Sequence, residues 1–471
     1  VCSSDLIKPK KGQTLNLKIE SLAFGGMGVA RIDGHVIFVK NSLPGQEVTA
    51  MVIKRKKNYL EARVTVIIEE SPFSVPIRCD HFKYCGGCTF QNLDYPQQLI
   101  QKQSQVADVM RRLGRFENAE IATIVGCDRK FHYRNKMEYT FSNRRFITEL
   151  DEDLPRDFVL GQHTPGKFDK ILNIDECHLQ ESECSAILQI VKHTAYENKI
   201  EPYDILKHTG FLRYLIIRNS FSSGEIMVNM VTSSEEPVLL DPIVDILMEK
   251  YPSITSIINN INTRKGGTSQ GEKEIVLFGK PFITESIGRY QFEISANSFF
   301  QTNPIQAEKL YEMILEDCEL TGSETVYDLY CGTGTIGIFL AESAKEVIGI
   351  ELVNSSVMNA RENAMKNDIE NIRFFKGDLM TYFNNYADVH SLPNPDVLVI
   401  DPPRSGMHPR TVTDVMEMAP DRIVYVSCNP STQARDLQLL CAEKYILLRC
   451  RPVDMFPHTP HIENISVMVK R

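Results

Sequence analysis

One cysteine stands at the end of an apolar run, in the segment IVYVSCNPST. Cys428 is followed at once by Asn429 and Pro430, residue types that favour a rigid turn. Most buried cysteines behave as small hydrophobic residues, and this chain has 12 cysteines. A thiolate at the end of a strand is, by contrast, a strong nucleophile. Whether Cys428 only caps a strand or acts as a catalytic group depends on the other motifs that the fold places beside it.

A glycine-rich turn marks a candidate cofactor site. In VYDLYCGTGTIGIFLA, Gly332, Gly334 and Gly337 satisfy the pattern G-x-G-x-x-G between a predicted strand and a predicted helix. Glu351 ends the next predicted strand, where a carboxylate can accept hydrogen bonds from the ribose hydroxyls of a nucleoside cofactor. Nicotinamide dinucleotides and S-adenosylmethionine both fit this pattern, so the turn alone leaves the two cofactors open.

A further strand end favours S-adenosylmethionine. After the apolar run LVI, the chain reads Asp401-Pro-Pro-Arg404. Asp-Pro-Pro beside a glycine-rich turn is typical of S-adenosylmethionine-dependent methyltransferases, although it is also simply a rigid turn. Enzymes that methylate amino groups usually carry an aromatic residue at the fourth position, where this chain has Arg404. The pattern therefore predicts methylation of a carbon atom, with another group activating the target.

Cys428 is the candidate for that activating group, with carbon 5 of uracil as the target. Carbon 5 is a poor nucleophile until a thiolate adds to carbon 6 and turns the ring into an enolate. After methyl transfer, a base must remove the proton on carbon 5 before the thiolate leaves. The segment DMFPHTPHIEN follows a predicted strand and offers Glu463 as that base. A glutamate near a C-terminus is usually a solvated charge, but its histidine and proline neighbours favour the catalytic interpretation.

Three other cysteines have the spacing of metal or cluster ligands. CDHFKYCGGC places Cys79, Cys85 and Cys88 in the pattern C-x5-C-x2-C within a glycine-rich loop. Zinc sites more often show a second C-x2-C pair, which this sequence lacks. The downstream cysteines that can complete the ligand set are Cys127, Cys177 and Cys184.

The elements that must position these residues fall into three parts, because a chain of 471 residues is too long for one hydrophobic core. Short strands with Gly-Gly and Pro-Gly turns predict a small antiparallel barrel over residues 8–70. Residues 71–285 mix strands and helices and contain the cysteine loop. Residues 286–471 alternate strands and helices regularly, which predicts a parallel, helix-covered sheet. The predicted fold class is therefore α/β, with a Rossmann-like C-terminal domain.

The charge distribution points to a polyanionic partner. The net charge is −9, yet residues 1–145 carry 23 Lys and Arg against 14 Asp and Glu, and the remainder carries 29 against 47. A basic front half is expected where one part of a protein holds nucleic acid. The basic segments that we expect to contact RNA phosphates are Lys54–Lys57, Arg111, Arg112, Arg115 and RKFHYRNK (129–136). Phe131, Tyr133, Phe299 and Phe300 are candidates for stacking on bases, with core packing at least as common a role for each.

Composition gives no sign of a membrane protein. Hydrophobic residues make up 42% and charged residues 24% of the chain, with no apolar run of membrane-spanning length. No charged-then-apolar leader ends in a small-residue cleavage site. We therefore expect a cytoplasmic location, where cysteines are more often free, metal-bound or catalytic than paired in disulfides.

At this point the chain resembles the RNA (uracil-5-)-methyltransferase family. IVYVSCNPST and MFPHTPHIEN look like the two signature segments of that family, and QTNP (301–304), DLYCGTG and DPPRSG match its cofactor segments in the same order. The resemblance implies Cys428 as the nucleophile and Glu463 as the base. The cofactor contacts that it implies for S-adenosyl-L-methionine are Gln301, Tyr330, Glu351, Asp378 and Asp401.

The N-terminal half also resembles members of this family. The barrel is similar to the TRAM domain, an OB-like RNA-binding module. The cysteine spacing is similar to that of the iron–sulfur members, whose fourth ligand corresponds to Cys177 in NIDECHL, which implies a [4Fe-4S] cluster. Barrel and cluster together favour the branch that methylates a uridine of 23S ribosomal RNA, with transfer RNA as the alternative substrate. We expect a monomer that contacts no membrane.

Two other functions are compatible with single features of the sequence. A non-catalytic RNA-binding factor could retain the fold, but the presence of both Cys428 and Glu463 argues against it. A nicotinamide-dependent oxidoreductase would explain the glycine pattern alone, and Asp401-Pro-Pro-Arg404 disfavours it.

Overall fold

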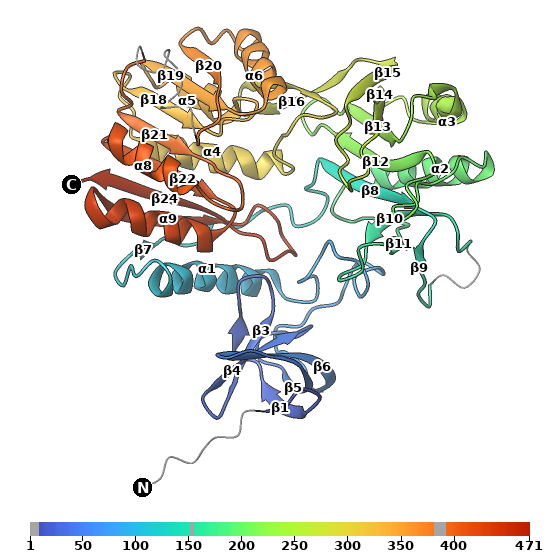
Figure 1. Cartoon of the computed structure of the whole chain (residues 1–471), viewed down its shortest axis with the longest axis horizontal. Helices are drawn as coiled ribbons and strands as arrows, with labels where there is room; N and C mark the ends of the chain where they lie inside the picture. Colours follow the sequence, from blue (N-terminus) through green and yellow to red (C-terminus); the bar gives the residue numbers. More distant parts are fainter. Residues whose placement is uncertain (1–8, 151–154, 381–391) are drawn as a thin grey trace.

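The structure is a computed structural model that describes residues 9–150, 155–380 and 392–471. Six strands near the N-terminus form one curved sheet in the order β1-β5-β6-β4-β3-β2, at the bottom of Figure 1. Alternate side chains of these strands point inward, so that Leu15, Leu17 and Val48 share one apolar core. The strands are β1 (Thr14–Lys18), β2 (Ser21–Leu22), β3 (Gly28–Ile32), β4 (His35–Lys40), β5 (Glu47–Arg55) and β6 (Tyr59–Glu69).

An eight-stranded mixed sheet forms the second part, in the order β15-β14-β13-β12-β8-β10-β11-β9. Two helices, α2 (Ser182–Glu197) and α3 (Asp241–Lys250), share a core with it. A short 3-10 helix, η1 (Pro237–Leu240), leads into α3. The strands are β8 (Lys136–Ser142), β9 (Arg145–Phe146), β10 (Val159–His163), β11 (Ile171–Asn173), β12 (Leu212–Asn219), β13 (Ile226–Thr232), β14 (Ile254–Ile261) and β15 (Lys273–Gly279).

The C-terminal part is built on a second eight-stranded sheet, in the order β20-β19-β18-β21-β22-β24-β23-β7. Its strands β18 to β22 pair in parallel, while β24 is antiparallel to both β22 and β23. A separate hairpin, β16 (Phe282–Ile287) and β17 (Tyr290–Ser295), precedes it. The strands are β7 (Glu120–Ile121), β18 (Thr325–Leu329), β19 (Glu346–Glu351), β20 (Ile372–Lys376), β21 (Val397–Ile400), β22 (Arg422–Ser427), β23 (Tyr445–Val453) and β24 (Glu463–Lys470).

Helices cover both faces of this C-terminal sheet. Successive residues of a strand point to opposite faces, so Val326 packs with one group of helices and Tyr327 with the other. The first group contains α4 (Pro304–Cys318), α5 (Thr335–Ala341) and α6 (Asn354–Lys366). The second contains α1 (Tyr95–Arg112), α8 (Pro409–Met418) and α9 (Pro430–Glu443). This arrangement confirms the predicted α/β fold class with a Rossmann-like C-terminal part.

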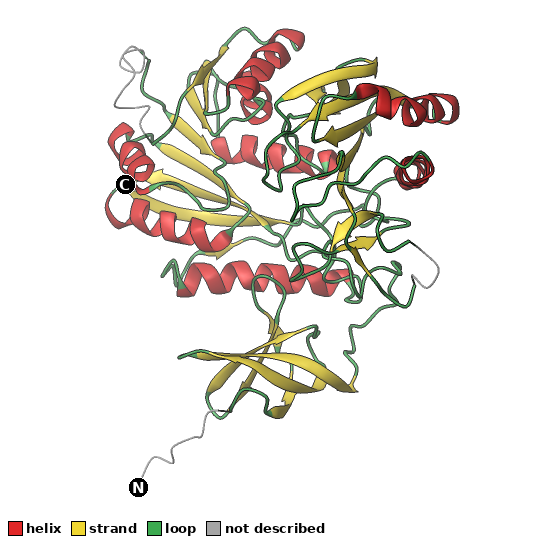
Figure 2. Cartoon of the chain, turned by 45° about the vertical axis from the view of Figure 1, so that its right-hand side comes forward, coloured by secondary structure: helices red, strands yellow, loops and turns green. Residues whose placement is uncertain are grey.

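The helix α1 lies between the barrel and the C-terminal sheet (Figures 1 and 2). The sequence predicts this helix from Pro96 to a stop at Gly114, and in the structure it spans Tyr95–Arg112 with Leu113, the residue before Gly114, as its C-cap. Its apolar face packs against α9 and β23, and β7 pairs with β23. Residues 95–121 therefore lie with the C-terminal sheet, although the predicted boundaries assign them to the central part 71–285. Local sequence patterns do not reveal such a return of the chain to a distant sheet.

Candidate active site

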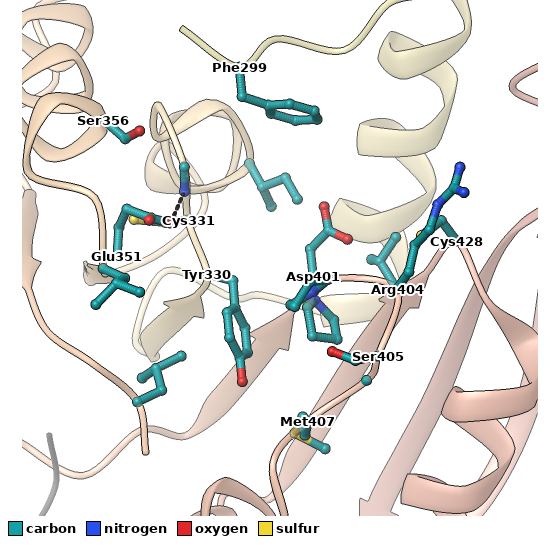
Figure 3. Close-up of a pocket in the computed structure, with 18 of the residues that line it drawn as sticks. Phe299, Tyr330, Cys331, Glu351, Ser356, Asp401, Arg404, Ser405, Met407 and Cys428 are labelled. Atoms are coloured by element: carbon teal, nitrogen blue, oxygen red, sulfur yellow. Dashed lines mark hydrogen bonds between the residues drawn. The ribbon is translucent and has the colours of Figure 1, made fainter. Parts of the chain in front are cut away.

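A single large cavity lies along the carboxyl ends of β18, β19, β21 and β22, the edge at which α/β folds bind ligands. Its volume is about 1020 Å³. Residues of the five predicted motifs meet there, as Figure 3 shows for the labelled side chains. The predicted cofactor and catalytic residues that line it are Gln301, Tyr330, Glu351, Asp378, Asp401, Cys428 and Glu463. The structure thus brings all seven predicted residues together.

Glu351 is held at the glycine-rich turn by backbone hydrogen bonds. Its carboxylate accepts from the N–H of Gly332 at 3.2 Å and from the N–H of Val353 at 2.8 Å. Figure 3 shows Glu351 beside the turn that carries Cys331. Gly332 and Gly334 have φ angles of 55° and 79°, a conformation that favours glycine. The turn therefore presents a fixed carboxylate to the cavity, as recognition of a ribose requires.

Two aspartates lie near each other at the cofactor edge, Asp328 buried and Asp401 partly buried in the lining of the cavity. Burial raises the pKa of Asp401 to about 7. Burial and the charge of Asp401 raise the pKa of Asp328 to about 8, although Asp328 accepts a hydrogen bond from the N–H of Gly337 at 2.9 Å. Sequence reasoning missed Asp328, and the only signal was a carboxylate inside the otherwise apolar strand VYDL. A bound cation would favour the ionised form of both groups.

Cys428 lies between the end of β22 and the start of α9. Asn429 caps α9 by accepting a hydrogen bond from the N–H of Ser431, and Pro430 occupies its first turn. The side chains of Asn429 and Thr432 both donate to the carbonyl of Arg404, at 3.0 and 3.2 Å. The turn after the cysteine therefore ties the β22 end to the Asp-Pro-Pro-Arg loop.

The Cys428 thiol is not ionised at neutral pH in this structure. Burial and the nearby charge of Glu463 raise its pKa to about 11, and a hydrogen bond and charge from Arg404 oppose that rise. Figure 3 shows Arg404, Asp401 and Cys428 next to one another. Arg404 is thus the cation that favours the thiolate.

Glu463 lies near Cys428, at the end of the antiparallel pair β22 and β24. The last pair of that ladder is Ser427 with Asn464, so Cys428 directly follows β22 where Glu463 begins β24. Both side chains line the same cavity. Burial and the charge of Asp401 raise the pKa of Glu463 well above its usual range, while Arg404 lowers it. A buried carboxyl of this kind is a strong base once it has lost its proton.

His461 is a further residue of the cavity. Burial, helped by the charges of Arg404, Lys102 and Arg134, lowers its pKa to about 4. It is therefore neutral at physiological pH. Its ring lies edge-on to Phe456, with 6.1 Å between the ring centroids.

The four candidate cluster ligands lie near one another. The charge of Cys177 raises the pKa of Cys79, Cys85 and Cys88, in each case behind the larger effect of burial. Two of the sulfurs accept hydrogen bonds, Cys85 from the N–H of Gly87 at 3.4 Å and Cys88 from the Nε2 amide of Gln91 at 3.2 Å. Within the described part of the chain, no three His, Cys, Asp or Glu side chains are arranged to hold a single metal ion.

The predicted RNA-contacting residues divide into exposed and buried groups. Phe299 is 65% exposed at the cavity, whereas Tyr133 and Phe300 belong to the core. Phe131 stacks on His458, with 4.3 Å between the ring centroids, beneath the guanidinium of Arg78. Several predicted cations already have acidic neighbours: Lys54 pairs with Glu61, and Arg111 and Arg112 pair with Asp108. No helix among residues 9–150, 155–380 and 392–471 is long and apolar enough to cross a membrane.

Comparison with known proteins decides the family. Residues 260–471 match the family model for tRNA (uracil-5-)-methyltransferases, and residues 8–65 match that for the TRAM domain. An RNA methyltransferase of Porphyromonas gingivalis is 41% identical over 466 residues, which cover 96% of this chain and 99% of that protein. The chain belongs to the RNA uracil-5-methyltransferase family. A relative from Chlorobaculum tepidum, also described as an RNA methyltransferase, is 39% identical over 98% of this chain and 97% of its own length.

A solved structure of the RNA uracil-5-methyltransferase family has the same architecture. The tRNA (uracil-54, C5)-methyltransferase of Pyrococcus abyssi, in complex with S-adenosyl-L-homocysteine, superposes with a TM-score of 0.74 at 30% identity. The match covers 97% of this chain and 100% of that one. Membership of this family makes the chain an S-adenosylmethionine-dependent RNA methyltransferase with an RNA-binding TRAM domain.

Proposed function

We propose that this enzyme methylates carbon 5 of a specific uridine in 23S ribosomal RNA, with Cys428 as the nucleophile and Glu463 as the base. The observation that carries the proposal is the register of β22 and β24, which brings these two residues to adjacent strand ends in the cofactor cavity. The proposed reaction acts on two adjacent atoms, carbon 6 and carbon 5, of one pyrimidine ring. The nucleophile and the base must therefore both reach that ring. Gln301, Tyr330, Glu351, Asp378 and Asp401 would hold S-adenosylmethionine, which supplies the methyl group as an electrophile.

The proposed reaction uses two groups of this chain. The Cys428 thiol loses its proton to solvent, and the thiolate forms a bond to carbon 6 while the electrons of the C5–C6 double bond move toward oxygen 4, which makes carbon 5 nucleophilic. Once carbon 5 is methylated, Glu463 takes its remaining proton. The electrons of that C–H bond restore the double bond and expel the thiolate. Arg404 favours the thiolate at the first step.

The substrate assignment is supported by two features of the N-terminal half. The TRAM barrel and the four-cysteine set are the features that favoured ribosomal RNA in the sequence. The Pyrococcus abyssi relative acts on transfer RNA, so transfer RNA is the alternative substrate. Methylation of 23S ribosomal RNA and transfer RNA transcripts by the purified enzyme tests the assignment. Transfer of label to transfer RNA alone would refute it.

We also propose that Cys79, Cys85, Cys88 and Cys177 hold a [4Fe-4S] cluster. The four thiols lie close enough to influence one another's pKa, as the ligands of one cluster would. The donors on Cys85 and Cys88 fit as well, because N–H groups commonly stabilise cluster sulfur ligands. Such a cluster would organise the loop, and no redox step is assigned to it.

Two variants test the chemistry directly. Cys428→Ala should abolish methylation and covalent capture of 5-fluorouridine RNA, whereas retained capture would remove Cys428 from its role. Glu463→Gln should accumulate a denaturation-resistant adduct with ordinary uridine RNA, because the proton on carbon 5 stays in place. Normal turnover by Glu463→Gln would exclude it as the base.

A further inference from the structure

One face of α1 carries three buried polar side chains that the proposed chemistry does not use. Tyr95, Gln98 and Lys102 are three and seven residues apart, which puts them on the same side of the helix. Lys102 is 0% exposed and Gln98 is 1% exposed. Charged and amide side chains are seldom buried to this extent unless they have partners.

Their partners belong to the segment that precedes Glu463, residues 454–462, here called the base loop. Lys102 donates to the carboxylate of Asp454 at 2.7 Å and to the carbonyl of Phe456 at 3.2 Å. Tyr95 donates to the other oxygen of Asp454 at 2.8 Å. The side-chain oxygen of Gln98 accepts from the N–H of His458 at 2.9 Å. These four bonds fix the first half of the base loop to α1.

Other parts of the molecule meet the same segment. The N–H groups of Thr89 and Phe90, directly after Cys88, donate to the carbonyl of His458 at 2.8 and 3.0 Å. The hydroxyl of Tyr133 donates to the carbonyl of Pro457 at 3.1 Å. The tip of the β2–β3 turn in the barrel also lies close, because a Cβ added at Gly26 would be 3.4 Å from Cβ of Pro460.

These contacts lie close to Glu463. Val453 pairs with Glu463 in the ladder between β23 and β24, and Asp454 is the next residue. His458, in the middle of the contacted segment, has a φ of 66°, which a residue with a side chain adopts only when its surroundings impose it. The base loop is thus held in one conformation by α1, the cysteine loop, the central part and the barrel.

We propose that Tyr95, Gln98 and Lys102 are positioning residues that fix Glu463 for removal of the carbon-5 proton and tie its position to the RNA-binding parts of the enzyme. This inference rests on the proposed function. A displacement of about 1 Å in a catalytic group can lower a rate about 100-fold. Addition of Cys428 to carbon 6 does not use Glu463 as a base, so the two steps should separate when these contacts are weakened.

A purely structural role predicts a different outcome. Replacing a buried ion pair by apolar residues of similar size is often neutral for stability, whereas removing one partner alone is destabilising. The double variant Lys102→Met with Asp454→Leu therefore removes the polar grip while keeping the core filled. Gln98→Leu removes the amide contacts without leaving a charge. Gln97→Leu makes the same change at a partly exposed position of α1 and is the matched control.

The test compares two steps of the reaction in each variant. We expect Gln98→Leu and the double variant to lose about tenfold or more in turnover on uridine RNA, with an adduct that accumulates on that RNA. Capture of 5-fluorouridine RNA should stay within about twofold of the wild type, because it does not need the base. Unchanged turnover, or equal losses in turnover and capture, would overturn the inference.

Amide hydrogen exchange separates this inference from the proposed function. In Gln98→Leu, the amides of the base loop should exchange about tenfold faster or more than in the wild type, and Gln97→Leu should leave them unchanged. Equal exchange rates in all three proteins would refute the role of α1 in holding the base loop, whatever the substrate is. A wild type that captures no 5-fluorouridine RNA would refute the proposed function. The exchange rates would still show whether α1 holds the base loop.

Discussion

Replacing Arg404 by Met should slow the attack of Cys428. Arg404 opposes the rise in the pKa of Cys428 through a hydrogen bond and its charge, and that pKa is about 11. With this value, only ~0.1% of the thiol is ionised at a pH of about 8. The substitution removes the guanidinium but not the loop contacts, because Asn429 and Thr432 bond the backbone carbonyl of Arg404.

The expected size of the effect follows from the contact. A hydrogen bond to a charged group contributes about 1.5–3 kcal/mol, and the exposure of Arg404 to solvent argues for the lower end. One pKa unit corresponds to about 1.4 kcal/mol, so the pKa of Cys428 should rise by roughly one unit in Arg404→Met. At any pH below both values the thiolate fraction then falls about tenfold, and the deficit disappears as the pH passes the higher pKa.

The assay is the rate of covalent capture of 5-fluorouridine RNA between about pH 7 and pH 10. We expect Arg404→Met to follow the wild-type profile displaced by about one unit to higher pH, and Arg404→Lys to recover part of the displacement. Arg410→Met is the control, since Arg410 pairs with Asp414 and is not among the groups that shift Cys428. An equal rate in Arg404→Met and the wild type at every pH, or a loss that Arg404→Lys does not partly recover, would refute the reasoning.

Three further outcomes are expected. Binding of S-adenosylmethionine near pH 7 should release protons, because its positive charge favours ionisation of Asp401, whose pKa is about 7; calorimetry in buffers of different ionisation enthalpy measures this, and equal release with neutral S-adenosylhomocysteine would contradict it. Glu351→Ala should weaken S-adenosylmethionine about 10- to 100-fold by titration, whereas Glu346→Ala, at the far end of β19, should not. Anaerobically purified wild type and Cys127→Ser should be brown and contain iron, whereas Cys88→Ser should lose both; a colourless, zinc-loaded wild type would refute the cluster.

The convergence of the candidate site residues at one edge of the sheet could be predicted because its signals are local. Gly332, Glu351, Asp401 and Cys428 each end a strand, and the carboxyl ends of parallel strands meet at one edge whatever the connections between them. Asp328 escaped notice because its strand resembles an ordinary buried strand. Its significance comes from the carboxylate of Asp401 beside it, a contact between strands that are not consecutive.

The contacts between α1 and the base loop could not be predicted from the sequence for a different reason. Gln98 and His458 are 360 residues apart, and no periodicity of either segment signals their contact. The same holds for the return of β7 to the edge strand β23. The only trace of these contacts in the sequence is Lys102, a charged residue on the buried face of α1.

The pairing of β22 with β24 has a consequence for how this enzyme can change over evolutionary time. A hydrogen-bonded ladder joins the strand ends that carry Cys428 and Glu463, while α9, β23 and the base loop connect them along the chain. Substitutions on the exposed faces of α9 and β23 can accumulate without altering this pairing, whereas the base loop is constrained by its contacts. Loss of a single residue within β24 would turn every later side chain to the opposite face, because the side-chain period of a strand is two. Lineages should therefore tolerate insertions in the turn between α9 and β23 and lose any odd-numbered length change inside β24.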